Sequence, residues 1–128
     1  MAVKSAKELN VYVKAYALAM KVFELSKRFP AEERYALTSQ IRRSSRSAPC
    51  NLREAWAKRR YEAHFISKLT DCDAENSETE TSLDFAKDCG YITLEVHAAL
   101  IADCAEIGRM LGSMINNPTP FLLPRASP

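Results

Sequence analysis

Apolar residues recur every three or four positions along most of this chain, in four long stretches. This spacing places apolar side chains on one side of an α-helix. The 128 residues include only three glycines, and no stretch alternates between polar and apolar residues as a strand would;. The sequence therefore predicts an all-α protein, with a four-helix bundle in residues 1–115 and a tail in residues 116–128.

Prolines and glycines suggest where the four helices end. The first helix is expected from about Lys7 to Phe29, because the residue before Pro30 avoids helical geometry. The second begins near Ala31 and is expected to kink or split at Pro49, where proline removes a backbone hydrogen bond. The third and fourth span about residues 62–89 and 93–113. The tail contains four prolines and is expected to be extended or disordered.

The first helix carries apolar residues on two opposite faces. One face contains Leu9, Tyr12, Val13, Tyr16, Met20 and Phe23. The opposite face contains Val11, Leu18, Val22, Leu25 and Phe29. A bundle core needs only one of them. We expect the face that begins with Val11 to be covered by another copy of the chain, since large bare apolar patches are rare. The alternative is that one face lies beneath the tail or stays half-exposed.

The four cysteines are too widely spaced for a zinc or redox motif. Cys50, Cys72, Cys89 and Cys104 form no Cys-x-x-Cys pair;. They are expected to be free, mostly buried thiols in a reducing compartment. The N-terminal stretch lacks the apolar run of a signal peptide, and no segment approaches the roughly 20 apolar residues of a membrane span. We therefore expect a cytoplasmic protein that does not enter a membrane.

The usual motifs of catalysis are missing from the sequence. His64 and His97 are the only histidines, and neither follows a glutamate by three positions, as ligands of a di-iron bundle would;. There is no Gly-x-Ser-x-Gly elbow and no glycine-rich phosphate loop. The sequence thus favours a non-catalytic protein without cofactor or metal, although an active site assembled in space can escape sequence inspection.

Positive charge is concentrated in residues 38–61, where Glu54 is the only acid. The basic residues are Arg42, Arg43, Arg46, Arg53, Lys58, Arg59 and Arg60. If the helix continues past Pro49, several of them project beside the core face. Arginine presents a planar fork of donors that suits phosphate or carboxylate.

Two partners compete for this basic segment. The first is internal, because the third predicted helix carries many acids: Asp71, Asp73, Glu75, Glu78, Glu80, Asp84 and Asp88. The second is the backbone of a nucleic acid, for which a row of arginines is the expected electrostatic footprint. The net charge of only +2 favours the internal partner. The other exposed lysines favour the nucleic acid, and the residues alone leave both interpretations open.

Two stretches carry a family resemblance, RFPAEERYALTSQIRRSSRSAPCNLREA and ENSETETSLDFAKDCGYI. They resemble the 23S rRNA intervening-sequence protein family, also called four helix bundle proteins. The matching elements are Phe29-Pro30, Glu33-Arg34, residues 37–43, Ser47, Pro49, Asn51, Glu54 and Glu78. The resemblance implies an antiparallel, up-and-down bundle that assembles as a homopentamer, with no settled biochemical activity. A similar basic pentamer in diversity-generating retroelements binds a reverse transcriptase and nucleic acid.

The sequence and the resemblance together favour a non-catalytic homo-oligomer, pentameric by resemblance, that binds RNA or DNA through the seven basic residues. The alternative is a protein-interaction scaffold or accessory subunit whose charges are satisfied within the bundle. In that case the partner is another protein.

Overall fold

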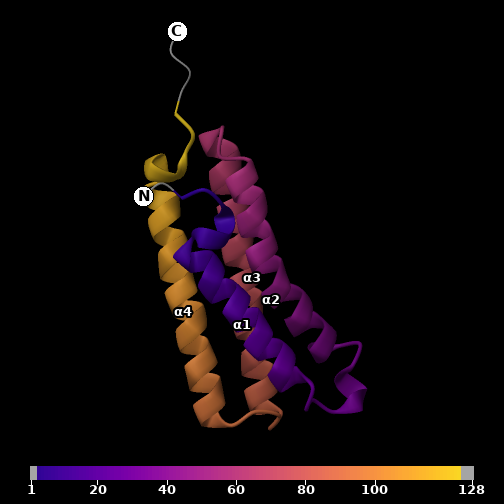
Figure 1. Cartoon of the computed structure of the whole chain (residues 1–128). Coiled ribbons are helices and arrows are strands. Elements are labelled where there is room, and N and C mark those ends of the chain that lie inside the picture. Colours follow the sequence, from indigo (N-terminus) through magenta and orange to yellow (C-terminus); the bar gives the residue numbers. More distant parts are fainter. Residues whose placement is uncertain (1–2, 125–128) are drawn as a thin grey trace.

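Four long helices form a bundle, as the sequence predicts (Figure 1). The structure is a computed structural model that describes residues 3–124, and no strand occurs among them. The helices are α1 (Asn10–Ser26), α2 (Leu37–Ala57), α3 (Glu62–Asp88) and α4 (Leu94–Asn116). Short 3-10 turns flank them: η1 (Ala6–Glu8), η2 (Ala31–Glu33) and η3 (Thr119–Phe121). The all-α fold class is therefore confirmed.

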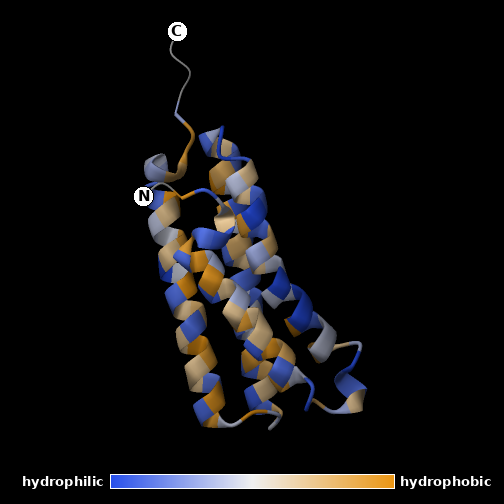
Figure 2. Cartoon of the chain, viewed as in Figure 1, coloured by the Kyte–Doolittle hydropathy of each residue, from blue (hydrophilic) through white to orange (hydrophobic). Residues whose placement is uncertain are grey.

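The core lies where the four helices face one another. Its largest fully buried side chains include Ile41 and Leu52 from α2, Phe65 from α3 and Ile107 from α4. The α2–α3 pair makes the most extensive contact between helices. Figure 2 shows hydrophobic residues along α1 and α4 and a strongly hydrophilic outer side on α2. That outer side of α2 carries the arginine-rich segment.

The region around Pro30 differs from the prediction. α1 ends at Ser26. From there to Phe29, each backbone N–H donates to the carbonyl of the residue three positions earlier, as in a 3-10 turn. The 3-10 turn η2 follows Pro30, and α2 begins only at Leu37, because Ala36 has a non-helical backbone (φ −122°, ψ −105°). The backbone N–H of Leu37 donates to Glu33 Oε1 at 3.3 Å. Glu32 and Glu33 thus lie in the turn before α2, although the second helix was expected to begin near Ala31.

Pro49 lies inside α2 and is buried, and the helix continues through it to Ala57. The expected split is therefore wrong, because a single helix spans the position. The kink stays a prediction. Gly90 ends α3 as expected: its φ of 79° lies in the left-handed region that favours glycine;. The N–H of Tyr91 then donates to the carbonyl of Ala86 at 2.8 Å, which closes the helix end.

The structure buries the face of α1 that the sequence assigned to a contact between copies. Val11, Leu18, Val22 and Phe29 are all buried in the core of the single chain, and Leu25 packs partly against it. The prediction that these five residues meet another copy is wrong for the four buried ones, because their own bundle already covers them. The outward face carries Val13, Tyr16 and Met20, whose side chains are 55%, 54% and 47% exposed.

Polar side chains, among them Asn76 and Thr79, are buried at the centre of the bundle. Asn76 donates from Nδ2 to the carbonyl of Cys104 on α4 at 2.9 Å. The hydroxyl groups of Thr79 and Ser44 lie 2.9 Å apart and share a hydrogen bond between α3 and α2. These bonds link residues of neighbouring helices that are about 30 positions apart in the chain. They therefore fix which residues face each other along the bundle.

The cysteines divide evenly between the core and the surface. Cys72 and Cys104 are buried, and burial raises the pKa of each thiol to about 12. Cys50 and Cys89 are exposed, so the prediction of mostly buried thiols holds for two of the four. All four are free cysteines. Within residues 3–124 we find no helix with the length and apolar character needed to cross a membrane.

The part of the tail that the structure describes folds back onto the bundle. Residues 119–121 form the turn η3, so the prediction of an extended tail is wrong there, while residues 125–128 lie outside the described range. The ring of Phe121 stacks on that of Phe65, with centroids 6.3 Å apart. The N–H of Leu123 donates to the carbonyl of Arg59 at 3.4 Å. An aromatic residue of the tail therefore covers one end of the core.

Replacing Phe121 with alanine is expected to lower the free energy of unfolding by about 1–2 kcal/mol, measured by urea denaturation. The effect is smaller than the roughly 3–5 kcal/mol of a fully buried phenylalanine, because Phe121 is only partly buried;. Leu123→Ala is the matched control, since Leu123 is exposed and its backbone bond survives. Equal stability of the Phe121→Ala and Leu123→Ala proteins would show that the tail does not cover the core.

Candidate nucleic-acid interface

The structure separates the seven predicted basic residues into two groups. Arg42, Arg43, Arg46 and Arg53 lie on α2, whereas Lys58, Arg59 and Arg60 lie beyond its end at Ala57, in the turn before α3. The positions that were predicted for a continuous helix therefore do not apply to this second group. Its arginine at position 59 stacks on the indole ring of Trp56, 3.9 Å from the ring centroid.

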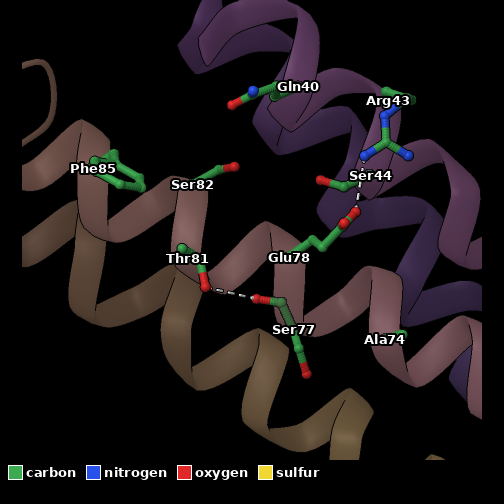
Figure 3. Close-up of a pocket in the computed structure, with 9 residues that line it drawn as sticks. All are labelled: Gln40, Arg43, Ser44, Ala74, Ser77, Glu78, Thr81, Ser82 and Phe85. Atoms are coloured by element: carbon green, nitrogen blue, oxygen red, sulfur yellow. Dashed lines mark hydrogen bonds and ion pairs between the residues drawn. The ribbon is translucent and has the colours of Figure 1, made fainter. Parts of the chain in front are cut away.

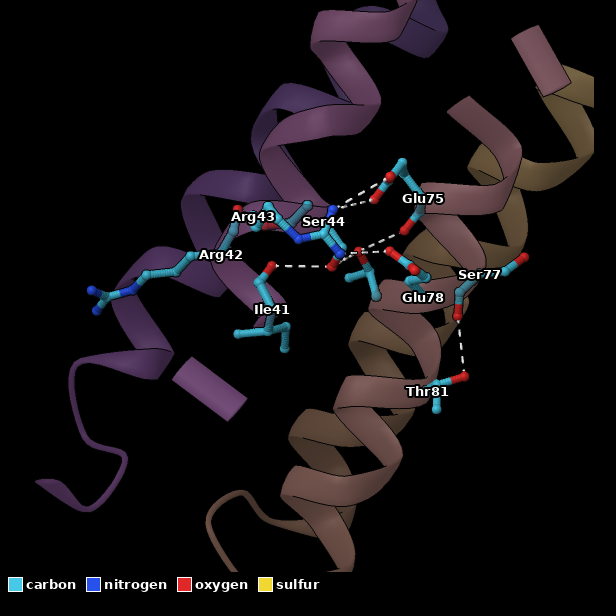
Figure 4. A network of polar contacts seen from close by, with 10 residues as sticks. Ile41, Arg42, Arg43, Ser44, Glu75, Ser77, Glu78 and Thr81 are labelled. Atoms are coloured by element: carbon cyan, nitrogen blue, oxygen red, sulfur yellow. Dashed lines mark hydrogen bonds and ion pairs between the residues drawn. The ribbon is translucent and has the colours of Figure 1, made fainter. Parts of the chain in front are cut away.

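Arg42 and Arg46 lie over the ring of Phe23, which α1 places beside α2. Their guanidinium carbons are 4.9 Å and 5.6 Å from the centroid of this half-buried ring. Arg42 also donates from Nε to the hydroxyl of Ser26 at 2.8 Å. Cation–π stacking and this hydrogen bond hold the guanidinium groups against α1. Figure 4 shows Arg42 pointing away from the ionic contacts of its neighbour Arg43.

Arg43 is neutralised within the bundle. Its Nη1 lies 3.3 Å from Glu75 Oε2 and its Nη2 lies 2.9 Å from Glu78 Oε2, both on α3 (Figure 4). The hydrogen bond from Arg43 lowers the pKa of Glu78, whereas partial burial raises the pKa of Glu75;. The internal interpretation of the basic segment therefore holds for Arg43.

A polar groove of about 510 Å³ lies beside this ionic contact, between α2 and α3 (Figure 3). Its walls include Gln40 and Arg43 from α2 and Glu78 and Phe85 from α3. Arg43 and Glu78 point toward each other across it. Because cation and carboxylate already satisfy one another, this groove has little charge left for an ionic ligand.

A second groove, of about 410 Å³, lies between α1 and α2 on the other side of α2. We call it the arginine–tyrosine groove, and it is lined by Tyr12, Tyr16, Ala19, Met20, Arg46, Pro49, Cys50 and Arg53. A neighbouring groove of about 630 Å³ shares Arg46 and Cys50 with it and adds Arg34, Tyr35 and Arg42, among others. The two hollows thus form one continuous surface along α2.

No acidic residue lines either hollow of this surface. Among the residues that the structure describes, no carboxylate lies within 4.0 Å of the charged nitrogens of Arg42, Arg46 or Arg53. Two acids of α3, Glu75 and Glu78, meet Arg43 instead. For these three arginines the internal partner that the sequence left open is therefore not present within residues 3–124.

Sequence reasoning missed the aromatic part of this surface. It assigned Tyr12, Tyr16 and Met20 to the apolar face that was left for the core of the bundle, but the structure places all three along the arginine–tyrosine groove. Tyr12 and Tyr16 lie one turn apart with ring centroids 6.1 Å apart. The signal in the sequence was the residue type, because tyrosine carries a hydroxyl that needs a polar partner or water when a helix face is packed.

The histidines and acids do not gather into a metal site. Within the described part of the chain, no three His, Cys, Asp or Glu side chains are close enough together to hold a metal ion. His97 Nε2 lies 2.7 Å from Asp84 Oδ1, and His64 packs edge-on against Tyr61. Both histidines thus lie at the edge of the bundle, beside other residues of the chain.

Known proteins resemble this chain in both sequence and fold. A family model described as 23S rRNA-intervening sequence protein matches residues 7–113. No curated protein matches the sequence. A solved structure of a protein of unknown function from the S23 ribosomal protein family of Bacteroides thetaiotaomicron is 32% identical, with a TM-score of 0.76. The similarity covers 84% of this chain and 96% of that chain.

Arg43→Gln is expected to lower the free energy of unfolding at pH 7 by no more than about 1 kcal/mol, because the ion pairs are largely exposed;. The pKa of Glu78 is lower in the folded protein. Its contribution is therefore present above the unfolded pKa, about 4.3, and is lost as the pH falls through the folded pKa. Urea denaturation at pH 7 and pH 3 measures this, and an undiminished difference at pH 3 would contradict the assignment.

Proposed function

Because the chain belongs to the 23S rRNA-intervening sequence protein family, we propose that it is a non-catalytic, homo-oligomeric bundle that binds RNA or DNA. Arg42, Arg46 and Arg53 are the phosphate-binding residues of this proposal. Arg43 serves the contact between α2 and α3 instead. Lys58, Arg59 and Arg60 form a separate basic corner that adds long-range attraction for a polyanion.

The observation that carries the proposal is the lack of carboxylates beside the three arginines, in a chain with 16 acidic residues. Unpaired guanidinium groups along one face attract phosphates, and each neutralised phosphate releases bound counterions. Phe23 supports two of these groups from below, so their N–H edges are already arranged for a bidentate contact;. The binding energy is then not spent on ordering two long side chains.

A protein scaffold remains the second candidate function, and the ion pairs of Arg43 favour it. That residue shows that part of the basic segment is satisfied by acids within the chain. In this alternative the remaining arginines contact an acidic protein. Arginine substitutions would then weaken binding to that protein and leave nucleic acids unbound by the native chain.

The oligomer is proposed from the apolar side of α1 that faces α4. A groove of about 960 Å³ runs between these helices, and its walls include Ala17, Met20, Val96 and Ala99. Val13 and Val96 are also exposed on this side. We propose that a second copy of the chain covers these residues, and the family resemblance suggests five copies in all. Met20 lines both this groove and the arginine–tyrosine groove, so the second copy would border the latter without reaching its wall of Arg46 and Arg53.

The triple substitution Arg42→Gln, Arg46→Gln and Arg53→Gln is expected to weaken binding of single-stranded RNA strongly. In fluorescence anisotropy titrations, the slope of log affinity against log salt should become less steep by about 2, because each phosphate contact contributes roughly 0.7. The cause is the loss of three charges that bind phosphates.

A matched control removes the same charge from another face. Lys14→Gln, Lys87→Gln and Arg109→Gln act on α1, α3 and α4, where the two lysines already pair with Glu106 and Asp88. This protein should bind RNA nearly as the native chain does. Equal loss in both triple variants would mean that net charge alone drives binding, and would reject the assigned surface.

Val96→Glu combined with Ala99→Glu is expected to convert the oligomer into single chains, because two charges would be buried in the contact between copies. Sedimentation velocity at micromolar concentration measures this, with circular dichroism to verify the helices. Tyr61→Glu is the control, since Tyr61 is exposed in the turn before α3. A native protein that sediments as a single chain would reject the oligomer.

A further inference from the structure

The arginine–tyrosine groove offers an aromatic ring as well as positive charge. Tyr12 is half-buried and packs against the core, while Tyr16, one turn later, keeps 54% of its surface exposed beside it. The rings are tilted by only 30° to each other. Tyr12 thus supports Tyr16 from one side, and the exposed ring is available for another flat group.

The opposite wall of the groove is cationic. Arg46 and Arg53 lie seven residues apart on α2, which is about two helical turns on one side of the helix;. Between them lie Pro49 and Cys50, whose small side chains leave the floor of the groove open. A chain-like anion that follows α2 would therefore meet two guanidinium groups in succession, with the tyrosine rings along its other side.

The concave shape of this site disfavours a duplex. Duplex DNA is read by a helix or ribbon that protrudes into the major groove, and duplex RNA by elements that span two minor grooves. Here α1 and α2 are both packed in the bundle (Figure 1). The site is a hollow that residues of both helices line. A duplex backbone would touch the arginines and leave Tyr16 without a partner. Unpaired bases, in contrast, stack readily on exposed aromatic side chains.

We infer that the ligand of the arginine–tyrosine groove is a single strand of nucleic acid, with one base stacked on Tyr16 and adjacent phosphates bound by Arg46 and Arg53. The inference rests on the proposed function and specifies its ligand. Contacts with the phosphates provide the part of the affinity that does not depend on the base sequence. The inference assigns the preference for single strands to the base on Tyr16, since every base has a flat face to stack.

The test compares three labelled probes of equal length at one salt concentration: an unstructured oligouridine, its abasic phosphodiester analogue and an RNA duplex. The native protein is expected to bind the oligouridine about tenfold more tightly than the abasic strand, which corresponds to one stacked base. Tyr16→Ala should remove this difference without changing the salt dependence. Tyr16→Phe should restore the difference, because the stacking ring remains.

Two controls separate the groove from the rest of the surface. Tyr61→Ala removes another exposed tyrosine that lies outside the groove, and it should leave the preference unchanged. The two exposed cysteines serve as reporters, because Cys50 lines the groove whereas Cys89 caps the end of α3. Bound oligouridine should slow alkylation of Cys50 by iodoacetamide and leave Cys89 unchanged. Binding without protection of Cys50 would overturn the assignment.

The inference and the proposed function fail in different ways. One outcome is that the native protein binds the oligouridine and the abasic strand equally, and that the triple arginine variant binds neither. This would contradict base stacking on Tyr16 and would support phosphate binding by the arginines. Tighter binding of the duplex than of the oligouridine would likewise contradict the inference that the ligand is a single strand. If the native chain binds none of the three probes, the proposed function itself is rejected, and the inference with it.

Discussion

The helical phase of α2 decides where each arginine points. The helix must bury Ile41, Ala48, Leu52 and Ala55 against its neighbours. At about 100° per residue, this choice places Arg42, Arg46 and Arg53 within about 40° of one another, on the side that faces α1. Arg43 falls beyond them and reaches toward α3. One constraint of packing thus divides a run of basic residues into a free group and a neutralised residue.

The sequence was sufficient for the helices and insufficient for the orientation of α1. Periodic apolar spacing identified all four helices because each is long and continuous. This holds for α2 as well, since the helix continues through Pro49. Both faces of α1 satisfy the same pattern, however, and apolar character alone could not rank them. The buried face carries small or aliphatic side chains such as Ala15, Leu18 and Val22, which permit close approach of the neighbouring helices;. Tyrosines on the outward face keep their hydroxyl groups near water.

The sequence predicted the types of residue that form the candidate site, but not which individual residues belong to it. A count of charges located the basic segment, yet neutralisation depends on contacts between residues far apart in sequence. Glu75 and Glu78 meet Arg43 from another helix, and Phe23 supports Arg42 from a third. The basic residues after Ala57 do not lie on the predicted surface for a simpler reason. The helix α2 ends at Ala57, so positions predicted from the period of a helix do not apply beyond it.

The division among the arginines has a consequence for selectivity. A phosphate that approached Arg43 would compete with two carboxylates and would leave them close together without their cation, which is electrostatically unfavourable. A phosphate that approaches Arg46 or Arg53 displaces water and counterions only. The same polyanion therefore meets a cost on the α3 side of α2 and none on the α1 side. In the proposed complex, this difference would direct a strand into the groove that holds the tyrosines, so Glu75 and Glu78 would contribute to binding by excluding the wrong side of the helix.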